Sequence, residues 1–157
     1  MRWRNGRYTP AMNGGCITTF TGRRIDPLAA RPQDIDLRDI AHALALTCRF
    51  KGHCRGFYSV AEHSVRVSRL LQQQAAPPRL LLAGLMHDAA EAYLSDVGGP
   101  IKPRFFVEIG DSMRSFAEAE DRLLEVIAAA LGFPAIDYEE IRPADMTLLA
   151  TEARDLL

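Results

Sequence analysis

The chain has 157 residues, of which 48% are hydrophobic and 25% charged, and its formal net charge is -1. This composition suits one globular domain with its own core, and the near-neutral charge argues against a nucleic-acid polymer or a membrane surface as the main partner. No apolar run approaches the roughly 20 residues of a membrane span. The cysteines, Cys16, Cys48 and Cys54, are odd in number, which favours a reducing cytoplasm over a disulfide framework.

The first third of the chain predicts an arm, a short hairpin and one helix. Residues 1–16 are basic but lack an apolar core, so we expect a loose or partner-ordered arm rather than a secretory signal. The β-branched residues 17–20 could pair with the segment after Gly22. Asp36 is a candidate N-cap, and the apolar spacing that follows predicts a first helix to about Arg49.

The middle of the chain predicts two consecutive helices. Ser59 and Glu62 form a capping-box pattern that starts the second helix, and His63 falls on the apolar face of that helix. Pro77 and Pro78 separate it from a third helix, which is apolar nearly all round. A helix of that composition is expected to be buried on most sides.

Ionisable side chains interrupt this apolar third helix. His87 and Asp88 are adjacent, and Glu91 follows His87 by four residues, which would place it on the same helix face. Asp96 comes just past the expected end of the helix. Buried charges are costly unless they are paired or bound to a metal ion, so these residues require a partner elsewhere in the chain.

The last third of the chain predicts two more helices. A long amphipathic helix is expected to fill most of residues 111–131. Pro143 is a suitable first-turn residue for a last helix, in which Asp145 and Glu152 share a face. The sequence therefore predicts a single all-α domain over residues 17–157, a bundle of five to six main helices with a possible short N-terminal β-hairpin.

The inward polar residues of three predicted helices can form a metal site. His63 comes from the second helix, His87 and Asp88 from the third, and Asp145 from the last. Two imidazoles and two carboxylates suit a divalent ion such as Mn, Co, Ni, Fe or Zn, which would offset the cost of burying them. Asp137 is a rival for the last position, but Asp145 lies inside the apolar-periodic helix.

Three stretches carry motifs of a known family: YSVAEHSVRVS, GLMHDAAEAYLSDVGGPIK and ADMTLLATEARDLL. Together they resemble the HD-domain phosphohydrolase superfamily, and in particular its small nucleotidase branch, which includes bacterial 5'-deoxynucleotidases and phage dATP triphosphohydrolases. The resemblance covers roughly residues 36–157. It implies an HD-domain helical fold and one divalent metal ion per site, with Mn, Co, Zn, Ni, Fe and Mg as candidates.

The resemblance also implies a role for each matching position. The four residues of the predicted metal site match the family's metal ligands: His63, His87, Asp88 and Asp145. Glu91 and Asp96 match carboxylates that act on the attacking water or the leaving group. Arg49 matches an arginine that binds substrate phosphate, and Phe50 takes the place of an aromatic residue near the nucleoside. Apart from the resemblance, Lys102 could offer phosphate a point charge.

These observations predict a metal-dependent phosphohydrolase of deoxynucleotides, either a dNTP or dATP triphosphohydrolase or a 5'-deoxynucleotidase, that uses metal-activated water. The alternative is a non-catalytic HD domain that senses nucleotides or acts as a scaffold. A two-metal enzyme would need further histidines after His87, and the sequence has none. We expect a nucleotide and further copies of the same chain, in a homo-oligomer, as partners.

Four further residues could form a separate zinc-type cluster: His42, Cys48, His53 and Cys54. Their spacing lacks the CxxC pair that is typical of structural zinc sites, so we do not favour it.

Overall fold

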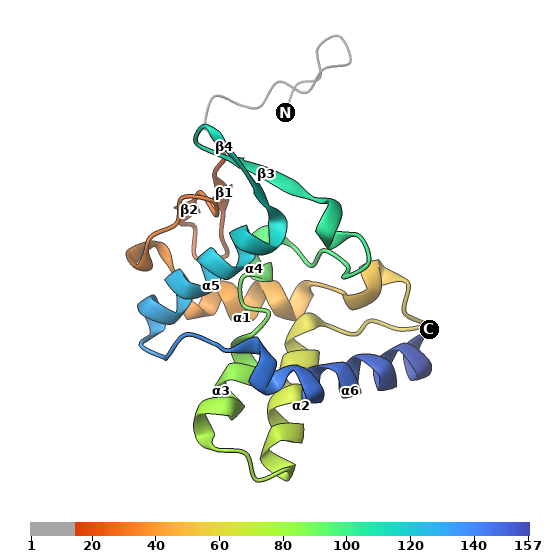
Figure 1. The fold of residues 1–157 in the computed structure, drawn as a ribbon. Coiled ribbons are helices and arrows are strands. Elements are labelled where there is room, and N and C mark those ends of the chain that lie inside the picture. Colours follow the sequence, from red (N-terminus) through yellow and green to blue (C-terminus); the bar gives the residue numbers. More distant parts are fainter. Residues whose placement is uncertain (1–14) are drawn as a thin grey trace.

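The computed structural model describes residues 15–157, and within that range the chain is mostly helical, as predicted (Figure 1). The α-helices in chain order are α1 (Leu37–Leu46), α2 (Val60–Gln73), α3 (Pro78–Met86), α4 (Glu91–Leu94), α5 (Phe116–Leu131) and α6 (Tyr138–Leu156). The predicted arm, residues 1–16, lies almost wholly outside the described residues. None of the helices between residues 15 and 157 is both long and apolar enough to cross a membrane.

Short hairpins and 3-10 turns connect the helices. The hairpins are β1 (Ile17–Thr18) with β2 (Arg24–Ile25), and β3 (Phe106–Ile109) with β4 (Ser112–Ser115), both antiparallel. The first is the predicted N-terminal hairpin, whereas the second was not predicted. The 3-10 turns are η1 (Pro32–Asp34), η2 (Arg49–Gly52) and η3 (Lys102–Arg104).

The first helix begins where the sequence predicts and ends earlier. Asp36 is the N-cap and accepts a hydrogen bond from the backbone of the residue two positions on, which confirms the predicted start. The helix ends at Leu46, so the predicted end near Arg49 is wrong. The chain leaves the helix because Cys48 forms an isolated β-bridge with Ser59, which brings the segment after α1 back alongside the start of α2.

Helices α2 and α3 lie side by side (Figure 1), and a glycine allows their close approach. Ser59 caps α2 and accepts from the backbone N–H of Glu62, which confirms the predicted start. On α3, a Cβ at Gly84 would lie 2.7 Å from a methyl carbon of Leu71 and 3.0 Å from one of Val67. Glycine at this position therefore lets the two helices approach closely, and with them the residues that they carry.

The predicted third helix is broken into two pieces at the chemically important residues. α3 ends at Met86, and α4 starts at Glu91. Between them, backbone hydrogen bonds run from Ala89 to Met86 and from Glu91 to Asp88, each spanning three residues rather than four. His87 and Glu91 therefore do not share one face of a continuous helix, and that prediction is wrong.

This tightened turn is fixed by burial of its small residues. Ala89 and Ala90 are 0% and 3% exposed and belong to the main hydrophobic core, together with Ile40 of α1 and Leu123 and Ile127 of α5. Anchoring the alanines in the core leaves the preceding histidine and aspartate at the edge of that core.

The fifth helix starts later than the sequence predicts. A helix over most of residues 111–131 was expected, but the chain forms strand β4 up to Ser115 and becomes helical from Phe116. A reciprocal capping box sets this start, because the Ser115 hydroxyl accepts from the Glu118 backbone while the Glu118 carboxylate accepts from the Ser115 backbone. Gly110, with φ of 61°, makes the turn between β3 and β4.

The last helix begins five residues before the predicted first-turn proline. α6 starts at Tyr138, so Pro143 lies inside the helix and its predicted role is wrong. Ile141 and Ala144 are buried in a second hydrophobic cluster with Val67 of α2. This packing seats α6 against α2 and α3 (Figure 1) and directs the remaining face of α6 toward the site described next.

Candidate metal centre

Three separated segments bring the four predicted metal ligands together. His63 Nε2 lies 3.0 Å from Asp145 Oδ1 and 3.9 Å from Asp88 Oδ2. His87 Nε2 lies 3.3 Å from Asp88 Oδ1 and 3.8 Å from Asp145 Oδ1. One ligand atom from each of His63, His87 and Asp88 lies within 4.8 Å of the other two. The group of ligand atoms within 4.8 Å thus comes from α2 and the turn after α3, and Asp145 of α6 lies beside both imidazoles without belonging to that group.

His63 is fully buried between two carboxylates. Its Nδ1 lies 2.9 Å from Glu152 Oε1, and because a carboxylate only accepts, Nδ1 carries the hydrogen. In a neutral imidazole Nε2 then holds a lone pair, and among the described residues this buried atom has no hydrogen-bond partner, although it faces Asp145. Burial lowers the pKa of His63, but Asp145 and Glu152 outweigh it and raise the pKa. Either a second proton or a cation is needed between His63 and Asp145, so this pair fits a metal ion.

His87 presents the same nitrogen to the cluster. Its Nδ1 lies 2.9 Å from the backbone carbonyl oxygen of Gly84, so Nδ1 donates and Nε2 is left to face the centre. The Tyr138 ring lies nearly parallel to the imidazole, with ring centroids 6.5 Å apart. Both histidines therefore direct Nε2 inward, as metal ligands held by a partner on the other nitrogen commonly do.

Asp145 is buried and strongly favours its charged form. The Tyr138 hydroxyl donates to Oδ2, and Oδ1 faces His63. Burial works against ionisation, but the neighbouring His63 imidazole and the hydrogen bond from Tyr138 outweigh it and lower the pKa of Asp145 to about 2. The lowered pKa favours the carboxylate anion, which is the form that binds a cation.

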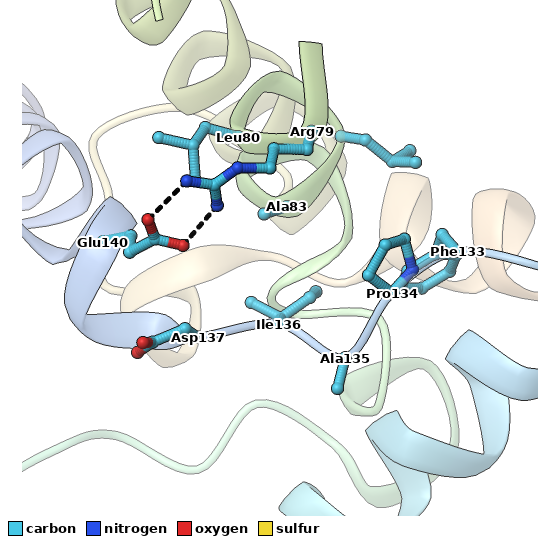
Figure 2. A pocket seen from close by; sticks show the side chains of 10 residues that line it. Arg79, Leu80, Ala83, Phe133, Pro134, Ala135, Ile136, Asp137 and Glu140 are labelled. Atoms are coloured by element: carbon cyan, nitrogen blue, oxygen red, sulfur yellow. Dashed lines mark hydrogen bonds and ion pairs between the residues drawn. The ribbon is translucent and has the colours of Figure 1, made fainter. Parts of the chain in front are cut away.

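The rival aspartate has a structural role. Asp137 is the N-cap of α6 and accepts from the backbone N–H of Glu139. It lines a different pocket, bordered by the ion pair between Arg79 and Glu140 (Figure 2). The geometry therefore favours Asp145 over Asp137 as the fourth ligand.

Glu91 is a buried carboxyl group beside the cluster. It is 8% exposed, and its Oε2 has no hydrogen-bond partner in the part of the chain that the structure describes. Burial, with the negative charges of Asp88 and Asp96 nearby, raises the pKa of Glu91 to about 9. A cation held by the four residues would lower this pKa, because an opposite charge favours the carboxylate. The protonation state of Glu91 thus depends on the charge next to it.

Asp96 and Lys102 are each paired with an oppositely charged side chain. Asp96 follows Ser95, which has a φ of 73°, and its Oδ1 lies 3.3 Å from Lys51 Nζ. Lys102, at the start of η3, has its Nζ 2.9 Å from Glu120 Oε2 on α5. Both cations of these pairs are available to a phosphate only in competition with a carboxylate.

Arg49 lies at the edge of the cluster on a strained turn. Its Nη1 is 3.6 Å from Asp88 Oδ2, and its side chain is 12% exposed. The next two residues, Phe50 and Lys51, have φ of 52° and 56°, a left-handed conformation that costs about 1 kcal/mol or more per residue. The Arg49 guanidinium lies 5.6 Å from the centre of the Phe50 ring. The turn η2 therefore holds the predicted phosphate arginine and the predicted nucleoside contact next to each other.

Two residues of the site were missed by the sequence reasoning. Tyr138 and Glu152 each contact a predicted ligand, Asp145 and His63 respectively. The available signal was spacing, since Tyr138, Asp145 and Glu152 follow one another at intervals of seven and so lie on one face of a helix. The face shared by Asp145 and Glu152 was noted, but no role was assigned to Glu152.

The zinc-type cluster does not form. His42 stacks on Phe20 with ring centroids 3.9 Å apart, and the Cys54 thiol donates to the backbone oxygen of Arg49. Between residues 15 and 157, the only grouping of three or more metal-ligating side chains at ligand spacing is the one around His63, His87 and Asp88.

The comparisons with known proteins agree with this geometry. The HD domain profile matches residues 60–148, which is more than half of the chain. The chain belongs to the HD-domain family, whose members bind divalent metal ions and are generally metal-dependent hydrolases.

Two relatives are similar over most of the chain, and both are uncharacterized. The Escherichia coli K12 protein YfdR is 36% identical over 140 residues, covering 89% of this chain and 71% of the relative. A Rhodobacter capsulatus protein is 40% identical over 122 residues, covering 74% of this chain and 58% of that relative. The alignments thus leave more than a quarter of each relative unmatched, and the relatives' names do not indicate a substrate.

Proposed function

We propose that the protein is a cytoplasmic metal-dependent phosphohydrolase of nucleotides, with deoxynucleotides as its preferred substrates. One observation carries the proposal: His63, His87 and Asp88 present ligand atoms within 4.8 Å of one another, with Asp145 beside both imidazoles and Arg49 3.6 Å from Asp88. The sequence motifs that resemble the small nucleotidase branch support the choice of a nucleotide.

The four converging residues would hold one divalent ion, with Mn, Co, Zn, Ni, Fe and Mg as candidates. When bound, such an ion acts as a Lewis acid toward phosphate and makes water a stronger acid. The inward Nε2 atoms and the anionic Asp145 provide the donor set that this requires.

Arg49 would bind the substrate phosphate. Its guanidinium presents parallel donors that match two phosphate oxygens, and it is held beside the cluster rather than in open solvent. Lys51 is 42% exposed and lies on the same turn, so it can leave Asp96 for a phosphate oxygen. Lys102, at the start of η3, adds a second positive charge. Phe50 would contact the nucleoside.

Glu91 and Asp96 would move the protons. Water attacks phosphorus and the bond from phosphorus to the leaving oxygen breaks, so the proton that the water loses must reach the leaving oxygen. Glu91 can accept the proton from the water, and Asp96 can order that water or deliver a proton to the leaving oxygen. A cation held by the metal centre would lower the raised pKa of Glu91, so that its carboxylate form is available to accept the proton.

Monophosphate and triphosphate substrates would differ in the number of cationic side chains that they engage. A 5'-deoxynucleoside monophosphate would need Arg49 and the metal centre alone. A triphosphate such as dATP would also engage Lys51 and Lys102, whose partners are the carboxylates of Asp96 and Glu120. Both classes belong in the test.

The test is a substrate panel with purified protein. Ribo- and deoxynucleoside mono-, di- and triphosphates are incubated with Mn²⁺, Co²⁺, Mg²⁺ or Zn²⁺, and the products are separated by chromatography. We expect release of phosphate or triphosphate from a deoxynucleotide. Tight nucleotide binding without turnover would instead indicate a sensing or scaffold domain, and no binding or turnover with any nucleotide would refute the proposal.

A further inference from the structure

Glu152 of α6 is a buried carboxylate that lies behind the candidate metal centre. It is 5% exposed, and both of its oxygens are in contact with polar groups. The Tyr58 hydroxyl donates to Oε1 at 2.6 Å, and His63 Nδ1 lies 2.9 Å from Oε1 and 3.1 Å from Oε2. Arg49 Nε lies 3.2 Å from Oε2. One carboxylate therefore meets a predicted metal ligand and the predicted phosphate arginine at the same time.

These contacts join segments that are distant in the chain. Arg49 and Tyr58 belong to the connection between α1 and α2, His63 to α2 and Glu152 to the end of α6. A carboxylate in this position would be costly to bury without partners, so its presence calls for a reason. Within residues 15–157 no backbone group hydrogen-bonds the Glu152 carboxylate, and its hydrogen bonds all come from side chains.

We propose that Glu152 is a positioning residue that prepares both the metal centre and the phosphate site. On the metal side it holds the hydrogen on His63 Nδ1, which directs the Nε2 lone pair toward Asp145 and Asp88 and makes the imidazole a better ligand. On the phosphate side its charge forms an ion pair with Arg49 that lacks hydrogen-bond geometry, and this pair favours one position of a flexible side chain that the substrate would otherwise have to order. This inference rests on the proposed function for the roles of His63 and Arg49.

The two contacts can be separated by substitution. In Glu152→Gln, the amide oxygen can still accept from Tyr58 and His63, but the amide nitrogen would be a donor facing the Arg49 donors. In Glu152→Ala, both contacts are lost. We therefore expect the Gln variant to lose phosphate affinity about tenfold with a smaller loss of metal affinity, and the Ala variant to lose metal affinity about 10–100-fold as well.

The experiment uses Co²⁺ and inorganic phosphate, so it does not depend on turnover. Co²⁺ is titrated into the metal-free full chain and followed by its visible absorption, and phosphate is then titrated calorimetrically into the Co²⁺-loaded protein. Asp155→Asn is the matched control, since Asp155 lies on the same helix, is exposed and pairs with Arg154. The control should bind both probes as the wild type does.

A double-mutant cycle distinguishes positioning from general loss of structure. If Glu152 acts on phosphate through Arg49, the Arg49→Gln/Glu152→Gln variant should bind phosphate no more weakly than Arg49→Gln alone. Additive losses, or wild-type affinities for both probes in Glu152→Gln and Glu152→Ala, would overturn the inference. Thermal unfolding of each variant shows whether it is folded. If the Ala variant is unfolded, the Gln variant alone tests the inference, because glutamine keeps the volume of the side chain. Failure of the wild type to hydrolyse nucleotides would be read separately, as a failure of the proposed function.

Discussion

Replacement of Asp145 or Asp137 tests which aspartate completes the metal centre. In Asp145→Asn a neutral amide takes the place of an anion whose Oδ1 lies 3.0 Å from His63 Nε2 and 3.8 Å from His87 Nε2. The shape is kept while the charge that attracts a cation is lost. In Asp137→Ala the cap of α6 is lost, and the two imidazoles are left as they are.

The two substitutions should affect different quantities, metal affinity for Asp145→Asn and the free energy of unfolding for Asp137→Ala. Removal of a charged ligand should weaken metal binding by about 100-fold or more, which corresponds to about 2.7 kcal/mol. An excess of metal at about 100 times the Kd should stabilise the wild type by about 2.7 kcal/mol and raise its Tm by about 5–10 °C. Asp145→Asn should lose most of this rise. Asp137→Ala should lower the free energy of unfolding by about 1 kcal/mol through the lost cap and keep the rise.

The assay is a thermal melt of both variants with EDTA and with excess Co²⁺, together with a direct Co²⁺ titration. If Asp145→Asn keeps the Co²⁺-dependent rise in Tm and Asp137→Ala loses it, the assignment of the fourth ligand is refuted.

Three further predictions concern catalysis, packing and assembly. Glu91→Gln should lower kcat by about 10²–10⁴-fold, because the amide cannot carry the proton, with little change in Co²⁺ affinity. Ile127→Ala should lower the free energy of unfolding, measured by urea denaturation, by about 2–5 kcal/mol because Ile127 is fully buried. Light scattering should give a mass above that of one 17.4 kDa chain, since Phe106 and Met113 of the β3–β4 hairpin are 59% and 64% exposed.

Each of these predictions has a result that would contradict it. An unchanged kcat in Glu91→Gln would remove that residue from proton transfer. The matched control for packing is Leu46→Ala at a site that is 66% exposed, and equal destabilisation by both substitutions would contradict the assigned core. A scattering mass of one chain at all concentrations would refute the homo-oligomer.

The sequence by itself predicted those parts of the fold that neighbouring residues decide. The caps at Asp36 and Ser59 act within one helical turn, so their positions follow from local pattern. Where local preferences were balanced, the sequence prediction failed. The apolar stretch through His87 continues a helical pattern, but burial of Ala89 and Ala90 in the core tightens the backbone there. The start of α5 was predicted too early because the β3–β4 hairpin takes up residues that have helical spacing.

The candidate site also has residues that the sequence predicted and residues that only the tertiary structure showed. Motif spacing in the sequence pointed to His63, His87, Asp88 and Asp145, because the residue types and their helical positions are visible in the chain. Only the tertiary structure could show that Glu152 lies against His63, 89 residues away, and that the same carboxylate contacts Arg49. The physical reason is that a contact between distant segments depends on how α6 packs against α2, and that packing is decided by buried surfaces contributed by the whole chain.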